Sequence, residues 1–425
     1  MEKSLKNICI IGLGYIGLPT ASVLATKGNF QVLGVDVSKN IVDTINAGNV
    51  HIVEPDLDIL VKSAVKSNHL KASLKPEKSD AFIIAVPTPF KNDKQPDISY
   101  VETAAYSIAP VLEPGNLVIL ESTSPVGTTE RIAEIIYQER KDLKDKVYFA
   151  HCPERVLPGR ILHELEENDR IIGGIDKISA KKAKELYQTF VKGLIFLTTA
   201  RTAEMCKLTE NAFRDVNIAF ANELSLICDK LNIDVWELIE LANHHPRVNI
   251  LQPGPGVGGH CIAVDPWFIV DSAPEEARLI RTARQVNDYK PSFIVNQIKE
   301  KAKSINNPVI ACLGLAFKAN IDDLRESPAI DVVRSLRKEN VGKILVVEPF
   351  IKELPLNLTD RFNEINQAEA AVTSEINMVV QLVDIKAALK EANIVVLLVN
   401  HSVFAGIDQE LLKDKIIIDT RGLWR

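Results

Sequence analysis

A cysteine behind a glycine-rich loop is the residue of this sequence best suited to covalent chemistry. The loop Gly254-Pro255-Gly256-Val257-Gly258-Gly259 is followed by Cys261, and Asp265 lies four residues further on. Glycines let backbone N–H groups approach a ligand, and a thiolate is a strong nucleophile where nearby cations lower the pKa of its thiol. Asp265 could orient a water or accept a proton. A buried, inert cysteine is the commoner case, so this pattern alone leaves both interpretations open.

A second group of polar side chains recurs at helical spacing. Lys207, Asn211 and Arg214 stand at positions i, i+4 and i+7 of a segment that begins near Thr202. A helix would therefore point an ammonium, an amide and a guanidinium in one direction. An apolar face at the 3.6-residue period is formed by Met205, Leu208, Ala212, Val216 and Ala219. The spacing predicts an amphipathic helix whose polar stripe is either solvated or binds a ligand.

A nucleotide-binding pattern lies near the N-terminus. Gly12-x-Gly14-x-x-Gly17 follows the apolar run 7–11 and opens a helical stretch, and the next apolar run, 31–35, ends at Asp36. Glycines at these places permit a tight turn, a close approach to a pyrophosphate and close packing of helix on strand. The pyrophosphate would lie at the helix N-terminus, where free N–H groups favour anions. Asp36 would accept hydrogen bonds from the adenosine ribose and repel a 2′-phosphate, which predicts NAD rather than NADP.

Apolar runs alternate with helical or polar stretches in two parts of the chain. In the first part they are residues 7–11, 31–35, 81–86, 117–120 and 147–150, and in the second 309–313, 344–347, 394–399 and 416–418. This alternation is typical of α/β folds, and it predicts two Rossmann-like, doubly wound parallel-sheet domains joined by a long central helix. The predicted domains are residues 1–200 for the first lobe, which carries the nucleotide-binding pattern, 201–300 for the central helical region and 301–425 for the second lobe. The polar stretch 352–375 is predicted to be a surface excursion.

The composition limits the classes of function. The 425 residues are 46% hydrophobic and 25% charged, and the net charge is −6. Without a polybasic run or a long apolar stretch, we expect neither nucleic-acid binding nor a membrane span. The first residues lack the features of a secretion signal, so we expect a cytoplasmic protein. The cysteines form no CxxC pair, which argues against a disulfide frame or a metal site, and we interpret Cys152, Cys206, Cys228 and Cys312 as core or near-core residues.

Seven short motifs occur in order and span nearly the whole chain. They are Ile11-Gly12-Leu13-Gly14-Tyr15-Ile16-Gly17-Leu18-Pro19, Glu121-Ser122-Thr123-Ser124-Pro125-Val126-Gly127, Cys152-Pro153-Glu154-Arg155, Lys207-x-x-x-Asn211, Gly258-Gly259-His260-Cys261-x-x-x-Asp265, Gly314-Leu315-Ala316-Phe317-Lys318 and Asp323-Leu324-Arg325-Glu326-Ser327-Pro328. Together they resemble the UDP-glucose/GDP-mannose dehydrogenase family. So many ordered motifs over this length make the resemblance highly specific.

The resemblance implies both an architecture and a reaction. It implies an NAD domain, a linking helix that builds a homodimer, and a C-terminal domain that binds the UDP portion of a UDP-sugar. It also implies a four-electron oxidation of the C6 alcohol that consumes two NAD. The first oxidation gives an aldehyde, which Cys261 captures as a thiohemiacetal; the second gives a thioester, and water releases the acid. A covalent adduct keeps the reactive aldehyde from escaping.

The same resemblance assigns roles to individual residues. Lys207 and Asn211 would stabilise the developing oxyanion, Asp265 would hold a catalytic water, and Glu154 would assist thioester hydrolysis. Residues implied in NAD binding are Gly12, Gly14, Tyr15, Ile16, Gly17, Asp36, Thr88, Thr123 and Arg325. Residues implied in substrate binding are Arg155, Val156, Lys207, Asn211, Arg214, His245, Arg247, Gly258, Phe317, Lys318 and Arg421. Arg247 would reach the site of the partner subunit, and the alternative role of these cations is a surface salt bridge.

The run 152–159 bears on the identity of the sugar. UDP-glucose members usually carry a Phe-x-Pro-Glu-Phe-Leu stretch where this chain has Cys-Pro-Glu-Arg-Val-Leu-Pro-Gly. The latter resembles the branch that acts on UDP-N-acetyl-D-mannosamine, whose product would be UDP-N-acetyl-D-mannosaminuronate, a precursor of surface polysaccharide. UDP-N-acetylglucosamine and UDP-glucose are the alternative substrates. A non-catalytic nucleotide-sugar binding protein and an NAD-dependent 3-hydroxyacid dehydrogenase are the competing hypotheses, and the second leaves Cys261 and the C-terminal lobe unexplained.

Overall fold

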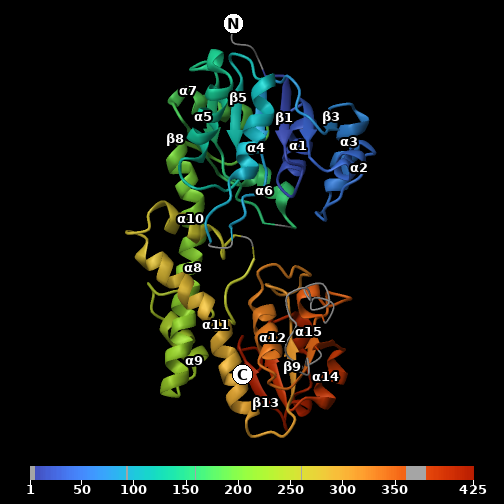
Figure 1. Ribbon diagram of the computed structural model, residues 1–425, viewed down its shortest axis with the longest axis vertical. Coiled ribbons are helices and arrows are strands. Elements are labelled where there is room, and N and C mark those ends of the chain that lie inside the picture. The colour runs from blue at the N-terminus through green and yellow to red at the C-terminus, as the bar shows by residue number, and fades with distance from the viewer. Residues whose placement is uncertain (1–4, 92–93, 158, 260, 360–379) are drawn as a thin grey trace, which may run out of the picture. The chain divides into compact units, whose positions relative to one another are not determined.

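The computed structural model describes residues 5–91, 94–157, 159–259, 261–359 and 380–425. The chain divides into two compact units. The first unit consists of Met1–Glu210 and Trp267–Pro274, and the second of Asn211–Pro266 and Glu275–Arg425. Figure 1 labels many of the helices and strands of both units.

The first unit is built on a sheet of eight described strands in the order β3-β2-β1-β4-β5-β6-β7-β8. The strands are β1 (Asn7–Ile11), β2 (Gln31–Val35), β3 (Leu70–Ser73), β4 (Ala81–Ile84), β5 (Leu117–Leu120), β6 (Tyr148–His151), β7 (Arg170–Gly174) and β8 (Ile195–Thr199). Neighbouring strands are parallel except β6 and β7, which pair antiparallel. The order reverses beside β1, the switch point at which open α/β sheets bind their ligands.

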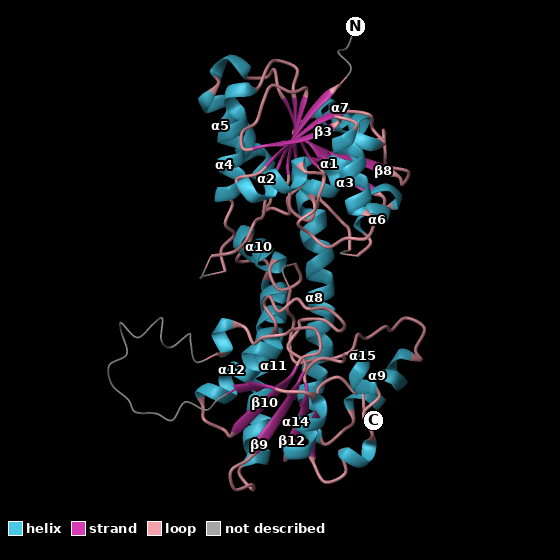
Figure 2. Ribbon diagram, turned by 90° about the vertical axis from the view of Figure 1, so that its right-hand side faces the viewer, coloured by secondary structure: helices cyan, strands magenta, loops and turns pink. Residues whose placement is uncertain are grey.

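Helices pack on both faces of this sheet because the strands are apolar on both sides (Figure 2). The helices are α1 (Gly17–Thr26), α2 (Lys39–Asn46), α3 (Leu57–Lys66), α4 (Ser99–Ile108), α5 (Thr128–Glu139), α6 (Ile161–Glu167) and α7 (Lys177–Tyr187), with the 3-10 turns η1 (Ala109–Val111) and η2 (Lys141–Leu143). In β1, Ile8 and Ile10 join a cluster with α1, α3, α6 and α7. Cys9 and Ile11 alternate with them and join a cluster with α4 and α5.

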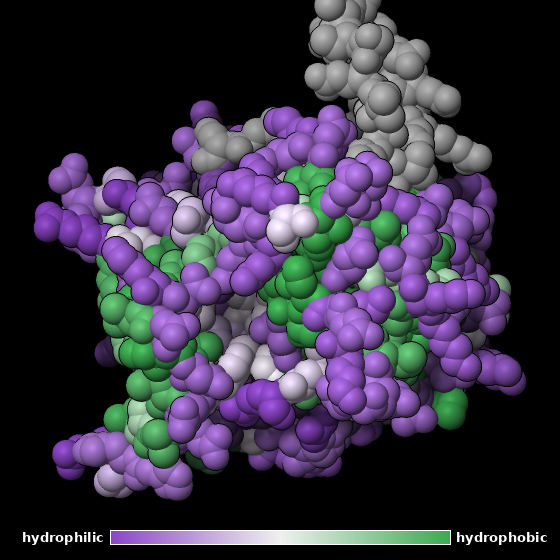
Figure 3. All heavy atoms as spheres, turned by 90° about the horizontal axis from the view of Figure 1, so that it is seen from below, coloured by the Kyte–Doolittle hydropathy of each residue, from purple (hydrophilic) through white to green (hydrophobic). Residues whose placement is uncertain are grey.

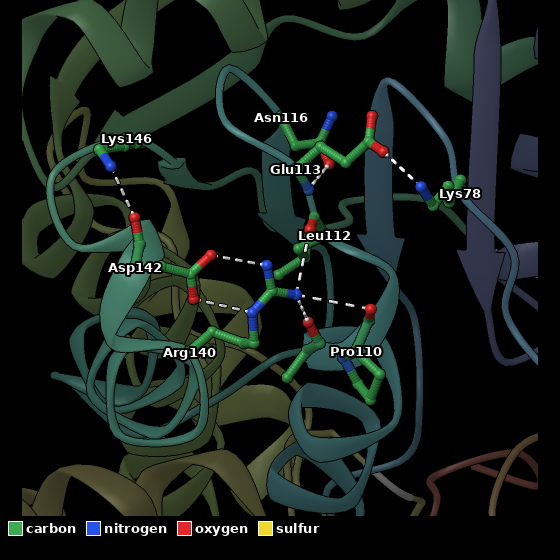
Figure 4. A network of polar contacts seen from close by, with 9 residues as sticks. Lys78, Pro110, Leu112, Glu113, Asn116, Arg140, Asp142 and Lys146 are labelled. Carbon is green, nitrogen blue, oxygen red and sulfur yellow. Dashed lines mark hydrogen bonds and ion pairs between the residues drawn. The ribbon is translucent and has the colours of Figure 1, made fainter.

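A polar network holds the loops at the amino end of β5. The Arg140 guanidinium, just after α5, donates to both carboxylate oxygens of Asp142 at 2.8 and 2.9 Å (Figure 4). It also donates to the backbone carbonyls of Ala109, Pro110 and Leu112. Asn116, the residue before β5, accepts the N–H of Glu113 at 2.7 Å. Because parallel strands present their ligand-binding loops at the carboxyl ends, this network supports the fold rather than the site.

The second unit contains a smaller parallel sheet in the order β11-β10-β9-β12-β13. Its strands are β9 (Val309–Leu313), β10 (Lys343–Val347), β11 (Val380–Leu382), β12 (Ile394–Leu397) and β13 (Ile416–Asp419), and its helices and turns are α12 (Pro328–Lys338), α14 (Ile385–Glu391), α15 (Ser402–Ala405), η3 (Leu356–Leu358) and η4 (Gln409–Leu411). In β9, Ile310 and Cys312 pack with α11 and α12, whereas Ala311 and Leu313 pack with α14 and α15.

Four helices of the described residues separate the two sheets in the sequence. They are α8 (Ala200–Leu231), α9 (Val235–Asn243), α10 (Asp265–Ser272) and α11 (Arg278–Ala302). Helix α8 is the long central helix that the sequence predicts. Two Rossmann-like parallel-sheet domains and this helix confirm the predicted fold class.

The buried side of α8 differs from the prediction. Met205, expected on the apolar face, is 38% exposed, and Asn211, expected on the polar stripe, is only 7% exposed. The buried side also carries Glu204, Asp215 and Asn222, each of them at 0% exposure. Polar side chains occupy this side because each finds a hydrogen-bond partner on another segment, which helical periodicity alone does not reveal.

Several predicted elements match closely, and others were not foreseen. Strands β1, β2, β5 and β9 have the predicted bounds, but β4 ends at Ile84, short of the predicted run 81–86. Strands β3, β7, β8 and β11 were not predicted. Of the predicted surface excursion 352–375, Leu358 is buried, which contradicts the prediction at that residue, and residues 360–375 lie outside the described residues.

The surface is mainly hydrophilic on the face shown in Figure 3, where hydrophobic side chains gather in separate patches. None of the described helices is both long and apolar enough to span a membrane.

Candidate active site

The glycine pattern lies at the carboxyl end of β1, where α1 begins. The backbone of Gly12 has φ +93°, and a Cβ there would lie 2.5 Å from the carbonyl oxygen of Ala85. A Cβ at Gly17 would lie 1.8 Å from the Gly12 oxygen, so glycine is required at both positions. Gly14 is exposed and has open space around it. The turn thus offers a surface that the pyrophosphate of NAD can approach, beside the exposed Tyr15 and the half-buried Ile16.

Asp36 follows β2 and faces this turn. Its Oδ2 accepts the N–H of Leu13 at 3.1 Å and its Oδ1 accepts the N–H of Ser38 at 2.9 Å. The carboxylate remains half-buried rather than enclosed. The geometry fits a group that also accepts hydrogen bonds from a ribose diol.

His51 is a neighbour of this acid that the sequence did not single out. Burial lowers the pKa of His51, against the opposing effects of Asp36 and the Leu13 carbonyl. Its Nδ1 finds no hydrogen-bond partner among the described residues. No spacing rule connects it with Asp36.

Thr88 and Thr123, the residues predicted near the nicotinamide, lie together. They follow the paired strands β4 and β5, and the Thr88 hydroxyl donates to the Thr123 carbonyl. The loop of Thr123 is anchored to α8 by Glu204, whose carboxylate accepts the N–H groups of Gly127 at 2.6 Å and Thr129 at 2.8 Å. Burial raises the pKa of Glu204 despite these hydrogen bonds. Glu204 is a further residue that sequence reasoning missed.

Glu154 lies after β6 in a largely buried position. Its Oε2 is 3.2 Å from a guanidinium nitrogen of Arg170, which is itself 2% exposed, and its Oε1 accepts the N–H of Arg155 at 2.5 Å. The guanidinium of Arg155 forms a two-point contact with Glu210 of α8, at 2.8 and 3.1 Å. Val156 is half-buried and packs against the core.

Lys207 and Arg214 lie on α8, half-buried and exposed respectively. Asn211, one helical turn beyond Lys207, donates its Nδ2 to Oδ2 of Asp265 at 2.5 Å. This pair joins residues that lie 54 positions apart in the sequence.

Cys261 is exposed and adjoins the start of α10. Its carbonyl accepts the N–H of Asp265 at 2.8 Å, and the Asp265 side chain is buried. The structure therefore places the backbone of Cys261 beside Asp265, and the Asp265 carboxylate beside the amide of Asn211.

The loop before Cys261 is held by a buried polar network. Asn222 on α8 accepts the N–H of Gly254 at 2.9 Å and donates to Asn287 at 2.8 Å. Asn287 donates to Asp215, which also binds Arg284 at 2.6 Å. Burial raises the pKa of Asp215, although Arg284 opposes this. No local sequence pattern predicts this network, because its members come from α8, α11 and the loop.

Two predicted substrate residues, Gly258 and Phe317, are in contact. A Cβ at Gly258 would lie 2.4 Å from the carbonyl oxygen of Glu326 and 2.9 Å from Phe317 Cβ. The N–H of Gly259 donates to the Arg325 carbonyl at 3.3 Å. The guanidinium of Arg325 binds Asp323 at 2.6 and 2.8 Å.

The remaining predicted cations differ in their surroundings. Arg421 packs against Gly254, where a Cβ would lie 2.7 Å from its guanidinium, and its Nε donates to the Leu398 carbonyl at 3.0 Å. Burial lowers the pKa of Arg421 to about 10, against the charge of Asp419. Three others are exposed: Lys318, His245 and Arg247.

The fold and the glycine turn define an NAD-dependent dehydrogenase with two Rossmann-like lobes. Three domain profiles match the chain: the NAD binding domain of the UDP-glucose/GDP-mannose dehydrogenase family over residues 6–191, the central domain over 201–289 and the UDP binding domain over 311–425. The chain belongs to the UDP-glucose/GDP-mannose dehydrogenase family, as the motifs predict, and is an NAD-dependent UDP-sugar dehydrogenase.

Curated relatives cover nearly the full chain. A UDP-N-acetyl-D-mannosamine dehydrogenase of Campylobacter jejuni is 58% identical, over 97% of this chain and 98% of its own. An NDP-N-acetyl-D-galactosaminuronic acid dehydrogenase of Ralstonia nicotianae is 57% identical, over 100% and 97%. Among solved structures, the UDP-D-ManNAc dehydrogenase of Pyrococcus horikoshii is 38% identical with a TM-score of 0.85, over 99% of this chain and 96% of its own.

Proposed function

We propose that the chain oxidises C6 of UDP-N-acetyl-D-mannosamine to the carboxylate, using two NAD per sugar and Cys261 as covalent nucleophile. The observation that carries the proposal is the grouping of the exposed Cys261 with Asp265 and Asn211. Residues 1–200 would bind NAD, 201–300 would form the dimer, and 301–425 would bind the UDP portion.

The chain's own residues divide the chemistry among them. NAD, when bound, accepts the hydride that leaves C6 in each oxidation. Lys207 and Asn211 stabilise the oxygen anion that develops at C6, because both point hydrogen-bond donors from one side of α8. The Cys261 sulfur forms a bond with the aldehyde carbon, so the aldehyde stays attached until it is oxidised to a thioester.

Release of the acid requires water. The water oxygen attacks the thioester carbon, the carbon–sulfur bond breaks, and the Cys261 thiolate leaves. Asp265 holds the water and Glu154 accepts its proton, which makes Glu154 the base of this step. The hydrogen bond from Asn211 to Asp265 at 2.5 Å supports this assignment, because it fixes the orientation of the carboxylate.

The remaining predicted residues would bind the two ligands. Arg325 would contact NAD, together with the glycine turn and Asp36. Those proposed to bind the sugar or diphosphate are Arg155, Val156, Arg214, His245, Arg247, Gly258, Phe317, Lys318 and Arg421. Guanidinium and ammonium groups suit a diphosphate, because they match its charge and donate to its oxygens.

The choice of sugar rests on the run 152–159 and on the curated relatives. The relative from Campylobacter jejuni is named for UDP-N-acetyl-D-mannosamine, and the one from Ralstonia nicotianae for N-acetyl-D-galactosaminuronic acid. A UDP-N-acetyl-D-galactosamine substrate is therefore the second candidate. Both sugars carry an acetamido group at C2, which offers a donor and an acceptor that a glucose hydroxyl cannot reproduce in the same place.

A homodimer is part of the proposal. Three exposed apolar residues stand seven positions apart on α8, namely Phe213, Phe220 and Ile227. Exposed apolar surface at such regular spacing is typical of a protein interface, and a second copy of this helix would cover it.

An assay of NADH formed per sugar tests the function. We expect two NADH per UDP-N-acetyl-D-mannosamine, little from UDP-glucose, and no stable aldehyde. Cys261→Ala should lower acid formation by roughly 10³-fold or more, because the covalent route is lost, and leave the Kd for NAD within about twofold. Cys206→Ala is the matched control and should keep its turnover.

Three outcomes would contradict the proposal. One NADH with release of aldehyde excludes the two-step route, and full turnover by Cys261→Ala excludes the nucleophile. Binding of the UDP-sugar without any NADH identifies a non-catalytic binding protein.

A further inference from the structure

A buried cluster of ionisable groups lies behind Glu154. Glu121, the residue after β5, is 1% exposed, and its Oε1 accepts the hydroxyl of Tyr187 at 2.6 Å. The hydroxyl of Thr20 donates to the other carboxylate oxygen at 3.4 Å. Arg170 lies over the Tyr187 ring, with 5.5 Å between guanidinium carbon and ring centroid, and binds Glu154 at 3.2 Å. Tyr187 therefore links the two carboxyl groups: it binds Glu121, and the guanidinium over its ring binds Glu154 and acts on Glu121 through its charge.

Burial controls the charge of this cluster. Burial, followed by the charge of Glu154, raises the pKa of Glu121 to about 7, although Arg170 and the two hydroxyls oppose the rise. Although burial disfavours its charge, the carboxylate of Glu154 raises the pKa of Arg170. Arg170 therefore stays a cation, and Glu121 is the carboxyl whose proton is gained or lost near neutrality.

The groups that face Glu121 come from four segments. Thr20 belongs to α1, Tyr187 to α7, Arg170 to β7, and Cys152 and Glu154 follow β6. Burial raises the pKa of Tyr187 well above its usual range and that of the Cys152 thiol to about 12, so both remain neutral at pH 6–9. Within the cluster, only the proton of Glu121 can change the net charge in that interval.

We propose that Glu121 is a positioning residue for thioester hydrolysis, whose charge sets, through the guanidinium of Arg170, how strongly Glu154 accepts a proton. This inference rests on the proposed function, in which Glu154 is the base of that step. When Glu121 is protonated, the positive charge of Arg170 is balanced by the carboxylate of Glu154 alone. When Glu121 ionises, its negative charge offsets Arg170 and repels Glu154, which then accepts a proton more readily.

Hydrolysis of the thioester is the step that depends on this charge. Water attacks the thioester carbon, its proton passes to Glu154, and the carbon–sulfur bond breaks with the electron pair on the Cys261 sulfur. The immediate products are the sugar carboxylic acid and the thiolate; the acid then loses the second proton of the water to solvent and becomes the carboxylate, and no oxidant or reductant is consumed. A stronger base at Glu154 speeds the attack, so the rate of hydrolysis rises as Glu121 loses its proton.

Single turnovers of the full chain test this inference. Excess enzyme is mixed with NAD and UDP-N-acetyl-D-mannosamine between pH 6 and 8.5 and quenched in acid, and intact-mass spectrometry follows the acyl adduct on Cys261. We expect its decay to accelerate by up to roughly tenfold with a midpoint near pH 7, since one pKa unit is a factor of ten in proton affinity. Glu121→Gln should remove this midpoint and hold the rate at its low-pH value, with the KM for both ligands within about twofold.

Two further variants make the test specific. Glu166→Gln is the matched control, because Glu166 is a buried carboxylate of the same unit that pairs with Lys27 and Lys192 instead. It should keep the midpoint. Tyr187→Phe removes a hydrogen bond that lowers the pKa of Glu121 and should move the midpoint to higher pH, which also serves if Glu121→Gln does not fold.

The possible failures can be told apart. An adduct that forms in the wild type but decays with the same pH dependence in Glu121→Gln and Tyr187→Phe overturns the role of Glu121 and leaves the proposed function intact. The absence of any adduct in the wild type overturns the covalent function and this inference with it.

Discussion

The two Rossmann-like lobes begin with the same turn and use it differently. Gly12 after β1 and Gly314 after β9 have φ +93° and +92°, and each donates its N–H at 2.8 Å to the last carbonyl of the next strand, Val35 or Val347. The following residue in each lobe donates to an acidic side chain, Leu13 to Asp36 and Leu315 to Glu348. The backbone conformation of the turn and its hydrogen bonds are thus the same in both lobes.

The two acids then differ in what else they bind. Glu348 is 5% exposed, and its Oε2 accepts the N–H groups of Leu315 at 2.7 Å and Ala316 at 3.0 Å and lies 3.1 Å from Nε2 of His401. Asp36 is half-buried and keeps capacity for a ligand. Glu348 therefore stabilises the turn of the second lobe, whereas Asp36 in the first lobe remains available to a ribose.

The chain after the turn differs as well. Helix α1 begins at Gly17, five residues after Gly12, whereas α12 begins at Pro328, fourteen residues after Gly314. The longer connection of the second lobe carries Phe317 and Lys318. The same strand-and-turn unit can therefore present either a helix N-terminus or a binding loop, depending on the length of the connection that follows.

Removing the buried carboxylate of Glu348 should have the largest effect on the stability of the fold. Glu348→Ala leaves the Leu315 and Ala316 amides and His401 without their acceptor, so we expect a loss of about 3–5 kcal/mol in the free energy of unfolding, measured in denaturant. Although burial alone would raise it, hydrogen bonds from His401 and the amides lower the pKa of Glu348. Its stabilisation is therefore present above the usual carboxyl pKa and lost as the pH falls through the folded value.

The Kd for NAD separates this prediction from a general loss of fold. It should stay within about twofold in Glu348→Ala at a temperature where the variant is folded. A weakened NAD site, or a loss of stability below about 1 kcal/mol, would show that the second acid is not the structural one.

The glycine that opens each turn, Gly12 or Gly314, is tightly packed in both lobes. A Cβ at Gly314 would lie 2.4 Å from Val399 Cβ, and one at Gly12 would lie 2.5 Å from the Ala85 oxygen. Because left-handed backbone alone costs a non-glycine residue about 1–2 kcal/mol, we expect Gly12→Ala and Gly314→Ala each to lose about 2 kcal/mol or more in thermal or denaturant unfolding. Only Gly12→Ala should weaken NAD binding in titration calorimetry. Equal NAD affinities in the two variants would contradict the assignment of the cofactor to the first lobe.

Strands could be predicted where apolar runs are continuous. β1, β5 and β9 are uninterrupted and buried, so their bounds follow from the sequence. β3 alternates an exposed Lys71 with buried neighbours at the edge of its sheet, and β7 opens with Arg170, which is buried only because Glu154 and the Leu165 carbonyl accept its hydrogen bonds. A pattern of residue types does not contain such partners.

The same reasoning explains which site residues could be predicted. Cys261 and the glycine turn carry their signal in adjacent residues. The burial of Asn211 depends on Asp265, 54 positions away, and Glu121 depends on Tyr187, 66 positions away. Helical spacing placed Asn211 on a polar stripe, and only the tertiary contact shows that this side is enclosed.

Neutralising Asp36 should have the smallest effect on the stability of the fold and the clearest effect on the affinity for the cofactor. Asp36→Asn keeps an oxygen for the Leu13 N–H but loses the charge, so we expect the free energy of unfolding to change by less than about 1 kcal/mol. The Kd for NAD should rise about tenfold, equivalent to ~1.4 kcal/mol, because a charged acceptor for the ribose hydroxyls becomes a neutral one. The Kd for NADP should fall, since the 2′-phosphate no longer meets a like charge. Glu348→Gln is the matched control and should leave both affinities unchanged. Titration calorimetry with the two cofactors measures all four values, and an unchanged NAD-to-NADP ratio in Asp36→Asn would remove the distinction between the two acids.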